Sequence, residues 1–75
     1  MNNARRKKLK EIVSVLENAK SDIEGVLNDE QDALDNLPEG LQGSERADSM
    51  QDAMDEIDNA IDFIDNAVDS LRNIL

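Results

Sequence analysis

The residues best suited to chemistry are aspartates that recur along the second half of the chain. Asp55, Asp58, Asp62, Asp65 and Asp69 follow one another at steps of three and four, so in a helix each is a surface neighbour of the next. Paired carboxylates can hold Mg²⁺ or Ca²⁺, but no segment matches the twelve-residue calcium loop. The chain also has no His and no Cys, which removes the commonest proton shuttles, nucleophiles and soft metal ligands. We therefore expect no enzyme, no metal site and no cofactor.

A row of like charges can instead meet a basic partner. Each like-charge contact costs roughly 0.2–0.5 kcal/mol in an isolated helix, and Asp is a weaker helix former than Glu, so solubility alone would favour Glu. Near the predicted loop only Lys20 and Arg46 are close enough to neutralise these acids. The alternative is a solvated face that has no partner. The partner-binding face that we predict consists of Asp48, Asp52, Asp55, Asp58 and Asp62.

Charge is unevenly distributed along the chain. The formal net charge is −10, yet five of the eight bases lie in the first ten residues. Residues 11–75 hold 18 acids and three bases, and they should repel nucleic acid and anionic lipid. Because a helix N-terminus disfavours cations, we expect the basic start, Arg5 to Lys10, to pair with Asp65, Asp69 or Leu75 rather than with phosphates. Nucleic acid is not an expected partner.

The acidic row belongs to a helix with a seven-residue repeat. Residues 53–73 read as three copies of one unit, AMDEIDN, AIDFIDN and AVDSLRN. In each unit the first residue is Ala, the second and fifth are larger and apolar, and the third is Asp, which gives one apolar seam beside one acidic row. The first half repeats similarly, with a seam expected at Leu9, Ile12, Leu16, Ala19, Ile23, Val26, Ala33 and Leu37, and with Val13, Leu27 and Leu34 widening it.

These two patterns predict an all-α fold with one domain, residues 1–75. Helix 1 is expected from about Asn3, as its N-cap, to about Asn36, because Pro38 disfavours helical geometry in the residue before it. The loop is expected at 37–43, and helix 2 at about 44–74 with Ser44 as its cap. A loop this short makes the two helices antiparallel neighbours.

A two-helix hairpin leaves apolar surface uncovered. The apolar arc of helix 2 spans roughly 160°, which is more than one antiparallel neighbour covers, and a chain of 75 residues buries little surface alone. We expect two copies to form a homodimeric four-helix bundle, the alternative being a monomeric hairpin. If Val15 and Phe63 are exposed, they are candidates for a partner contact. The predicted dimer interface consists of Ala53, Ala60, Phe63, Ala67, Ile57 and Ile64.

The segment ALDNLPEGLQGSER (33–46), set between an ARRK opening and the Ala-Ile-Asp heptads, resembles short acidic proteins encoded by phages and prophages of low-GC Gram-positive bacteria. The resemblance covers most of the chain, and its specific part is LPEGLQGSER (37–46). It implies an accessory role, since small phage proteins often inhibit host machinery or act as structural adaptors. It carries over no binding residue, and it leaves open whether this loop is a binding epitope or only a turn.

Together these patterns predict a non-enzymatic, phage-type protein of the host cytoplasm. Its acidic face is expected to bind a basic surface of a host protein, as an inhibitor or a DNA mimic. For a mimic, the eight acids from Asp48 to Asp69 extend over about 33 Å, so two copies approach the charge density of duplex DNA. The alternative is a structural module whose apolar seam drives assembly. No apolar run approaches the roughly 18 residues that cross a bilayer, and no signal-type apolar core follows the basic start, so a membrane is not an expected partner.

Overall fold

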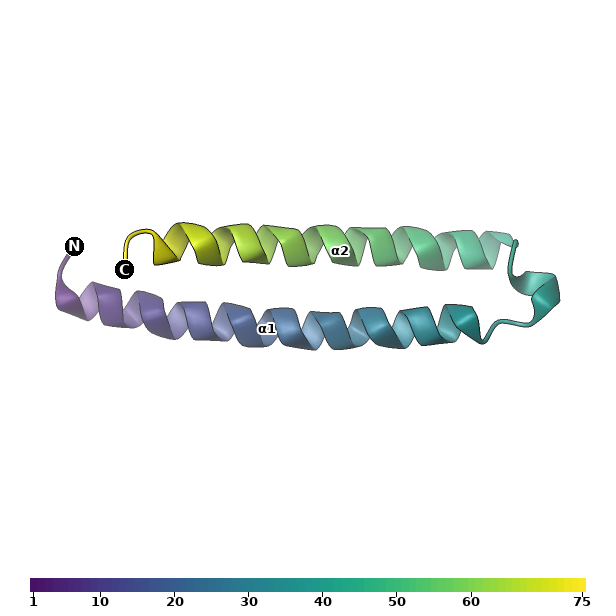
Figure 1. Ribbon diagram of the computed structural model, residues 1–75, viewed down its shortest axis with the longest axis horizontal. Coiled ribbons are helices and arrows are strands. Elements are labelled where there is room, and N and C mark those ends of the chain that lie inside the picture. Colours follow the sequence, from purple (N-terminus) through teal and green to yellow (C-terminus); the bar gives the residue numbers. More distant parts are fainter.

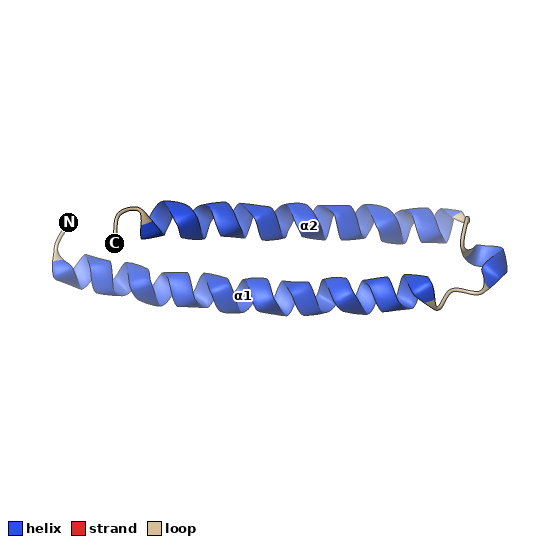
Figure 2. Cartoon of the chain, viewed as in Figure 1, coloured by secondary structure: helices blue, strands red, loops and turns tan.

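Two long helices lie side by side and antiparallel in the computed structural model, which describes residues 1–75 (Figure 1). Helix α1 covers Asn3–Asp35, helix α2 covers Glu45–Arg72, and a short 3-10 helix, η1, covers Glu39–Leu41 between them. All regular structure is helical (Figure 2), and the molecule measures 59 × 15 × 11 Å. The predicted all-α antiparallel hairpin is therefore confirmed. Both ends of the chain lie at one end of the hairpin, the terminal end, and the loop end lies opposite.

Each helix begins at a residue whose side chain accepts a hydrogen bond from the first turn. Asn2 caps α1, because its Oδ1 accepts from the backbone N–H of Arg5 at 2.9 Å. The cap is thus one residue earlier than the expected Asn3. Ser44 caps α2 as predicted, and its Oγ accepts from the backbone N–H of Ala47 at 3.4 Å. Such caps stabilise a helix by about 1 kcal/mol, because they satisfy amides that have no partner within the helix.

The loop is held by polar side chains that bond to its own backbone. Gln42 donates its side-chain amide to the carbonyls of Leu34 at 3.2 Å and Leu37 at 2.7 Å, near the end of α1. Ser44 donates its hydroxyl to the carbonyl of Leu41 at 2.6 Å. No glycine has a positive φ, so the conformation of the turn does not require Gly40 or Gly43. The loop is therefore ordered by side-chain capping, with Gln42 as its central residue.

A heptad register describes how the two helices meet. We label the seven positions a to g, with Val13 of α1 and Met54 of α2 at position a, and positions a and d then face the other helix. All four buried side chains, those of Val13, Ala47, Met54 and Val68, fall at position a. Apart from Arg6, which is exposed, every other residue at a or d within the helices is half-buried. On α1 this seam runs through Leu9, Val13, Leu16, Lys20, Ile23, Leu27, Glu30 and Leu34, and it continues to Leu37 in the loop.

On α1 the observed seam differs from the predicted one. Three residues predicted for the seam are exposed: Ile12, Val26 and Ala33. Three predicted only to widen it lie within it: Val13, Leu27 and Leu34. The row that faces α2 contains Val13, Leu27 and Leu34, whereas the row beside it alternates alanines with Ile12 and Val26. Because its apolar side chains are larger, packing the first row against α2 removes more apolar surface from water. Lys20 then falls in the seam, where its stem lies along apolar surface while its amine reaches solvent.

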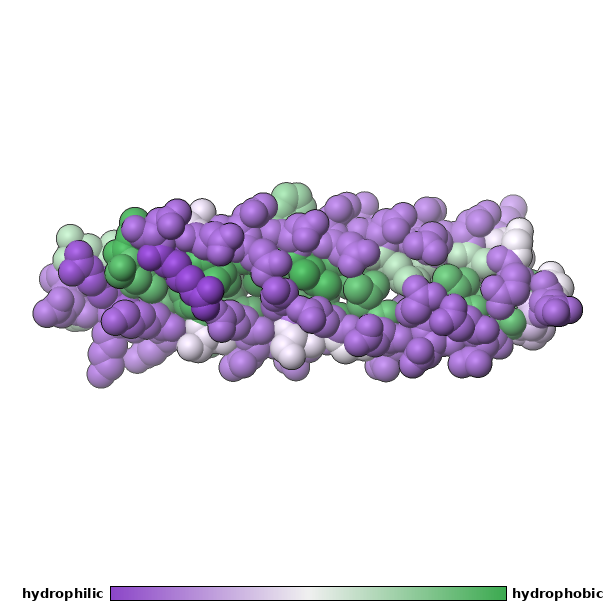
Figure 3. All heavy atoms as spheres, viewed as in Figure 1, coloured by the Kyte–Doolittle hydropathy of each residue, from purple (hydrophilic) through white to green (hydrophobic).

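The hairpin is one helix layer thick and covers its seam incompletely. Four of 75 residues are buried. In Figure 3 apolar atoms form a strip between the helices, and the two outer edges are mostly hydrophilic apart from an apolar group at the middle of the upper edge. The hairpin exposes 5459 Å², whereas a compact monomer of 8.3 kDa exposes about 4,600 Å². The single hairpin therefore leaves about 900 Å² more surface open than a globular fold of the same mass.

Candidate functional site

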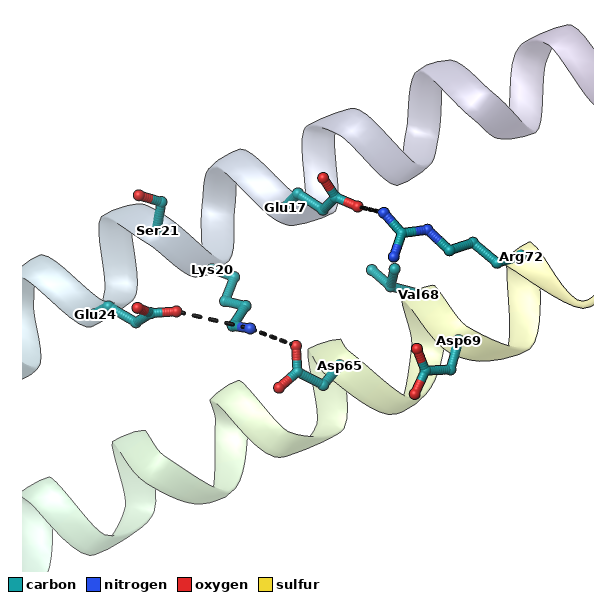
Figure 4. Close-up of a pocket in the computed structure, with 8 residues that line it drawn as sticks. All are labelled: Glu17, Lys20, Ser21, Glu24, Asp65, Val68, Asp69 and Arg72. Atoms are coloured by element: carbon teal, nitrogen blue, oxygen red, sulfur yellow. Dashed lines mark hydrogen bonds and ion pairs between the residues drawn. The ribbon is translucent and has the colours of Figure 1, made fainter.

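One side of the hairpin, here called the polar side, is a shallow groove of about 520 Å³ between the helices (Figure 4). Its lining residues fall at positions a, b and e of both helices: Glu17, Lys20, Ser21, Glu24, Asp65, Val68, Asp69 and Arg72. In an antiparallel pair, like heptad positions meet on each side of the seam. Because the e positions meet on the polar side, the g positions of both helices meet on the opposite side.

Ion pairs occupy the polar side. The amine of Lys20 lies 2.6 Å from a carboxylate oxygen of Asp65 and 3.8 Å from one of Glu24. Arg72 bridges from α2 to Glu17 of α1. The hydrogen bond to Asp65 is the main reason that the pKa of Lys20 is raised, and the negative charges of Asp65, Glu24 and Glu17 act in the same direction against desolvation. The bases of this groove are thus paired with acids of the same chain, which stabilises the hairpin.

The five predicted partner-binding aspartates lie together on the loop half of α2. We call this set, Asp48, Asp52, Asp55, Asp58 and Asp62, the acidic face. All five side chains are exposed, and none forms an ion pair. Gln51 donates a side-chain hydrogen bond to Asp55 at 3.2 Å. The acidic face occupies positions b, e and f, on the polar and outer sides of α2, and its charge has no basic partner within the hairpin.

The basic segment Arg5–Lys10 does not neutralise the end of α2, contrary to expectation. No ion pair joins this segment to α2. Lys8 has one partner, Glu11 of its own helix at 3.7 Å. The cause is an axial offset, because α1 begins well beyond the last turn of α2 at the terminal end, as Figure 1 shows. Asp65 pairs instead with Lys20, which lies further along α1.

The side opposite the polar groove carries an apolar surface, which we call the apolar flank. Its most exposed large side chains are those of Val15, Val26 and Phe63, which are 65%, 56% and 72% exposed, and Ile12 and Ile74 are also exposed. Alanines separate them at position g of both helices, and these small side chains allow a second helix to approach closely. The apolar flank consists of Ile12, Val15, Ala19, Val26, Ala33, Ala53, Ala60, Phe63, Ala67 and Ile74.

The six residues predicted for a dimer interface divide between two surfaces. Ala53, Phe63 and Ala67 are exposed and Ala60 is half-buried, and all four belong to the apolar flank. Ile57 and Ile64 are half-buried at position d, where they face α1 across the seam. From α1, sequence reasoning named only Val15 as a possible partner contact, and it assigned the other flank residues of α1 to the seam. The available signal was a spacing of seven residues at Ile12, Ala19, Val26 and Ala33, which matches the alanine spacing of α2.

The side chains do not form a preformed metal site. No three acidic side chains come close enough together to hold an ion. Neither helix contains an apolar stretch of the length that crosses a bilayer.

Comparison with models of known protein families, with curated proteins and with solved structures gives no match.

Proposed function

We propose that the protein acts by binding rather than by chemistry, and that the acidic face of α2 occupies a basic surface of a host protein. In this proposal two copies first join along their apolar flanks into a four-helix bundle. The observation that carries the recognition step is that five exposed carboxylates on one helix have no basic partner. Most acids of the chain are likewise unpaired, since only Glu11, Glu17, Glu24 and Asp65 have a base within ion-pair distance, so the acidic face is distinguished by five such carboxylates lying together on one helix.

Unpaired like charges on one helix have an energetic consequence that a basic partner would remove. Within the acidic face, Asp55 has Asp58 three residues away and Asp62 lies four residues beyond that, and like charges at these spacings cost roughly 0.2–0.5 kcal/mol per pair. A complementary positive surface would convert this repulsion into attraction and would speed association at low salt. Since the acidic face points away from the apolar flank, dimerisation would leave it accessible.

The extent of exposed surface supports the dimer. A compact particle of twice 8.3 kDa exposes about 7,600 Å². Two separate hairpins expose 5459 Å² each, so forming such a particle would remove about 3,300 Å² from water. This area falls within the range of obligate homodimers, about 2,000–5,000 Å². The apolar flank is the surface best suited to supply it, because it is the only side of the seam without ion pairs between the helices.

The resemblance of LPEGLQGSER (37–46) to phage-encoded acidic proteins suggests a bacterial host protein as the partner. A basic surface that normally contacts nucleic acid would suit the acidic face best, since carboxylates would stand where phosphates bind. In such a case the protein would be an inhibitor that mimics DNA. The mimicry would need both copies, because the acids of one helix are spaced more widely than the phosphates of a duplex.

Affinity capture from a lysate of a low-GC Gram-positive bacterium tests the recognition step. Three proteins serve as bait: the native chain, a variant with Asp55, Asp58 and Asp62 changed to Asn, and a control with three loop-end charges removed elsewhere. The control changes Asp32→Asn, Asp35→Asn and Glu39→Gln, which are also exposed. We expect a basic protein to be retained by the native and control baits and lost from the first variant, with helical content unchanged by circular dichroism.

Measurement with the purified partner then completes the test. Affinity should fall steeply with salt for the native protein and less steeply for the Asp55, Asp58 and Asp62 variant. Equal retention by all three baits would show that the acidic face is not the recognition element.

The second candidate function is an assembly module in which charge only maintains solubility. The observation that favours it is the surplus of exposed surface on a chain with four buried residues. It predicts a stable dimer in light scattering together with equal capture by all three baits. A species of 8.3 kDa at high micromolar concentration would contradict the dimer in both candidate functions.

A further inference from the structure

We infer that the second copy docks on the apolar flank head-to-tail, with the loop end of one hairpin against the terminal end of the other. The inference rests on the dimer proposed above and adds its orientation. Two two-fold arrangements can bring the flanks together. An axis along the hairpin would place loop on loop, and an axis across it would place loop on termini. The charges of the hairpin distinguish between them.

Charge is sorted along the length of the hairpin. In an antiparallel pair, position a of one helix lies level with position d of the other, which puts Lys20 level with Ile64. On the terminal side of this level, residues 1–19 and 65–75 hold six bases and four acids. On the loop side, residues 20–64 hold two bases and 14 acids. Loop on loop would stack two strongly negative halves, whereas head-to-tail places each beside the positive half of the other copy.

The same sorting appears at the edges of the apolar flank itself. Positions c and g of α1 carry Arg5 and Lys8 at the terminal end, and they carry Asp22 and Asp29 toward the loop. All four side chains are exposed. With the axis across the hairpin, α1 packs on α1 of the second copy and runs antiparallel to it. With the axis near Ala60, the bases of each α1 come level with the loop of the other copy, where Glu39 is exposed. Lys8 could pair there, because it is held only by a weak exposed pair with Glu11 at 3.7 Å.

The apolar rows of the flank fit this axis as well. On α2, Ala53 and Ala67 lie seven residues to either side of Ala60. On α1, Ile12 and Ala33 bound a row whose middle lies at about the same height as Ala60. A two-fold axis near Ala60 would therefore overlay each row on its own copy. The two α2 helices would match along most of their length, whereas the first turns of each α1 would extend past the end of the other α1. Phe63, the most exposed large apolar side chain, would lie next to the axis.

Distance measurement between two spin labels tests the orientation. Gly43 is a suitable site because it lies at the loop end and an added Cβ would meet no atom within 4 Å. The chain has no Cys, so Gly43→Cys gives a single labelling position. Head-to-tail docking predicts a label-to-label distance of about 50 Å, from the helical rise between the loop and the axis, whereas loop on loop predicts less than about 20 Å. The short distance would overturn the orientation and leave the dimer intact. Absence of dipolar coupling at high micromolar concentration would overturn the dimer as well.

Charge reversal provides an independent test. Changing Arg5→Glu and Lys8→Glu should weaken the dimer about tenfold at low salt, because like charges would then meet across the flank. Adding Glu39→Lys should restore part of the affinity, because Glu39 comes level with Lys8 of the other copy and its reversed charge would be complementary to the new Glu there. In a loop-on-loop dimer the terminal bases face each other in the native protein, so the first pair of changes would not weaken it, and this result would overturn the proposal.

Discussion

Phe63 provides the most direct test of whether the apolar flank is an interface. Its side chain is 72% exposed in the single hairpin, so the hairpin itself gains little from it. A buried Phe covers about 150–250 Å², of which about 110–180 Å² is thus open here. At about 25 cal/mol per Å², covering this surface contributes about 3–4 kcal/mol per copy, of which an Ala would retain roughly a third. Phe63→Ala should therefore cost about 4–6 kcal/mol per dimer and raise its dissociation constant about a thousandfold or more.

Sedimentation equilibrium over a range of concentrations measures this change. Circular dichroism checks that the hairpin persists, since Ala is a better helix former than Phe and the substitution should not unfold the monomer. Asn66→Ala is the matched control, because Asn66 is exposed on the outer side of α2 at position f. It should leave the dissociation constant unchanged. Equal dimer affinity of the Phe63→Ala variant and the native protein would refute the assignment of the apolar flank as the interface.

Three further predictions concern the hairpin itself. Gly25→Ala should raise the free energy of unfolding by about 1 kcal/mol and the Tm by about 4–8 °C, because an added Cβ meets no atom within 4 Å; a loss of stability would instead indicate a partner backbone at this position. Because the pKa of Lys20 is higher in the folded chain than its usual value of 10.5, the protonated amine stabilises the fold at any pH below 10.5. This contribution is lost as the pH rises through the higher pKa of the folded state. Thermal melts should therefore show the Tm falling above about pH 10.5, and falling less in a Lys20→Met variant, with no Tyr or Cys titrating in the same range; parallel curves for the two proteins would contradict the role of Lys20. Gln42→Ala should cost about 1–2 kcal/mol and speed amide hydrogen exchange at the end of α1, since two carbonyls lose their donor; unchanged exchange there would show that water replaces the side chain without cost.

Local signals account for the parts of the fold that the sequence predicts well. Pro38 ends α1 within a few residues through its own ring, and Ser44 caps α2 through a bond to Ala47, three residues away. The acidic face is equally readable, because spacing alone places its aspartates on one side of a helix. Its basic partner stays a prediction.

Features that depend on the pairing of the helices are harder to predict. Ile12 and Val13 each begin a mostly apolar row of α1 residues spaced seven apart, and only packing against α2 selects the second row, which includes Lys20, as the seam. The axial offset has the same origin, so the expected ion pairs of Arg5–Lys10 with α2 do not form. Gln42 bonds to a carbonyl eight residues earlier, and that carbonyl becomes a neighbour only after the loop has folded.

The capped loop has a consequence for the order in which the chain folds. Contacts between the helices near Leu37 and Ala47 join residues close in sequence, whereas those at the terminal end must close a segment of more than 50 residues, as Arg72 and Glu17 do. Loop-closure entropy rises with that separation, so the hairpin should nucleate at η1 and zip toward its termini. In a head-to-tail dimer the terminal end of each hairpin, which closes last, would lie against the loop end of the other, which forms first. The folded loop end of one copy would then provide a surface on which the last turns of the other copy pack.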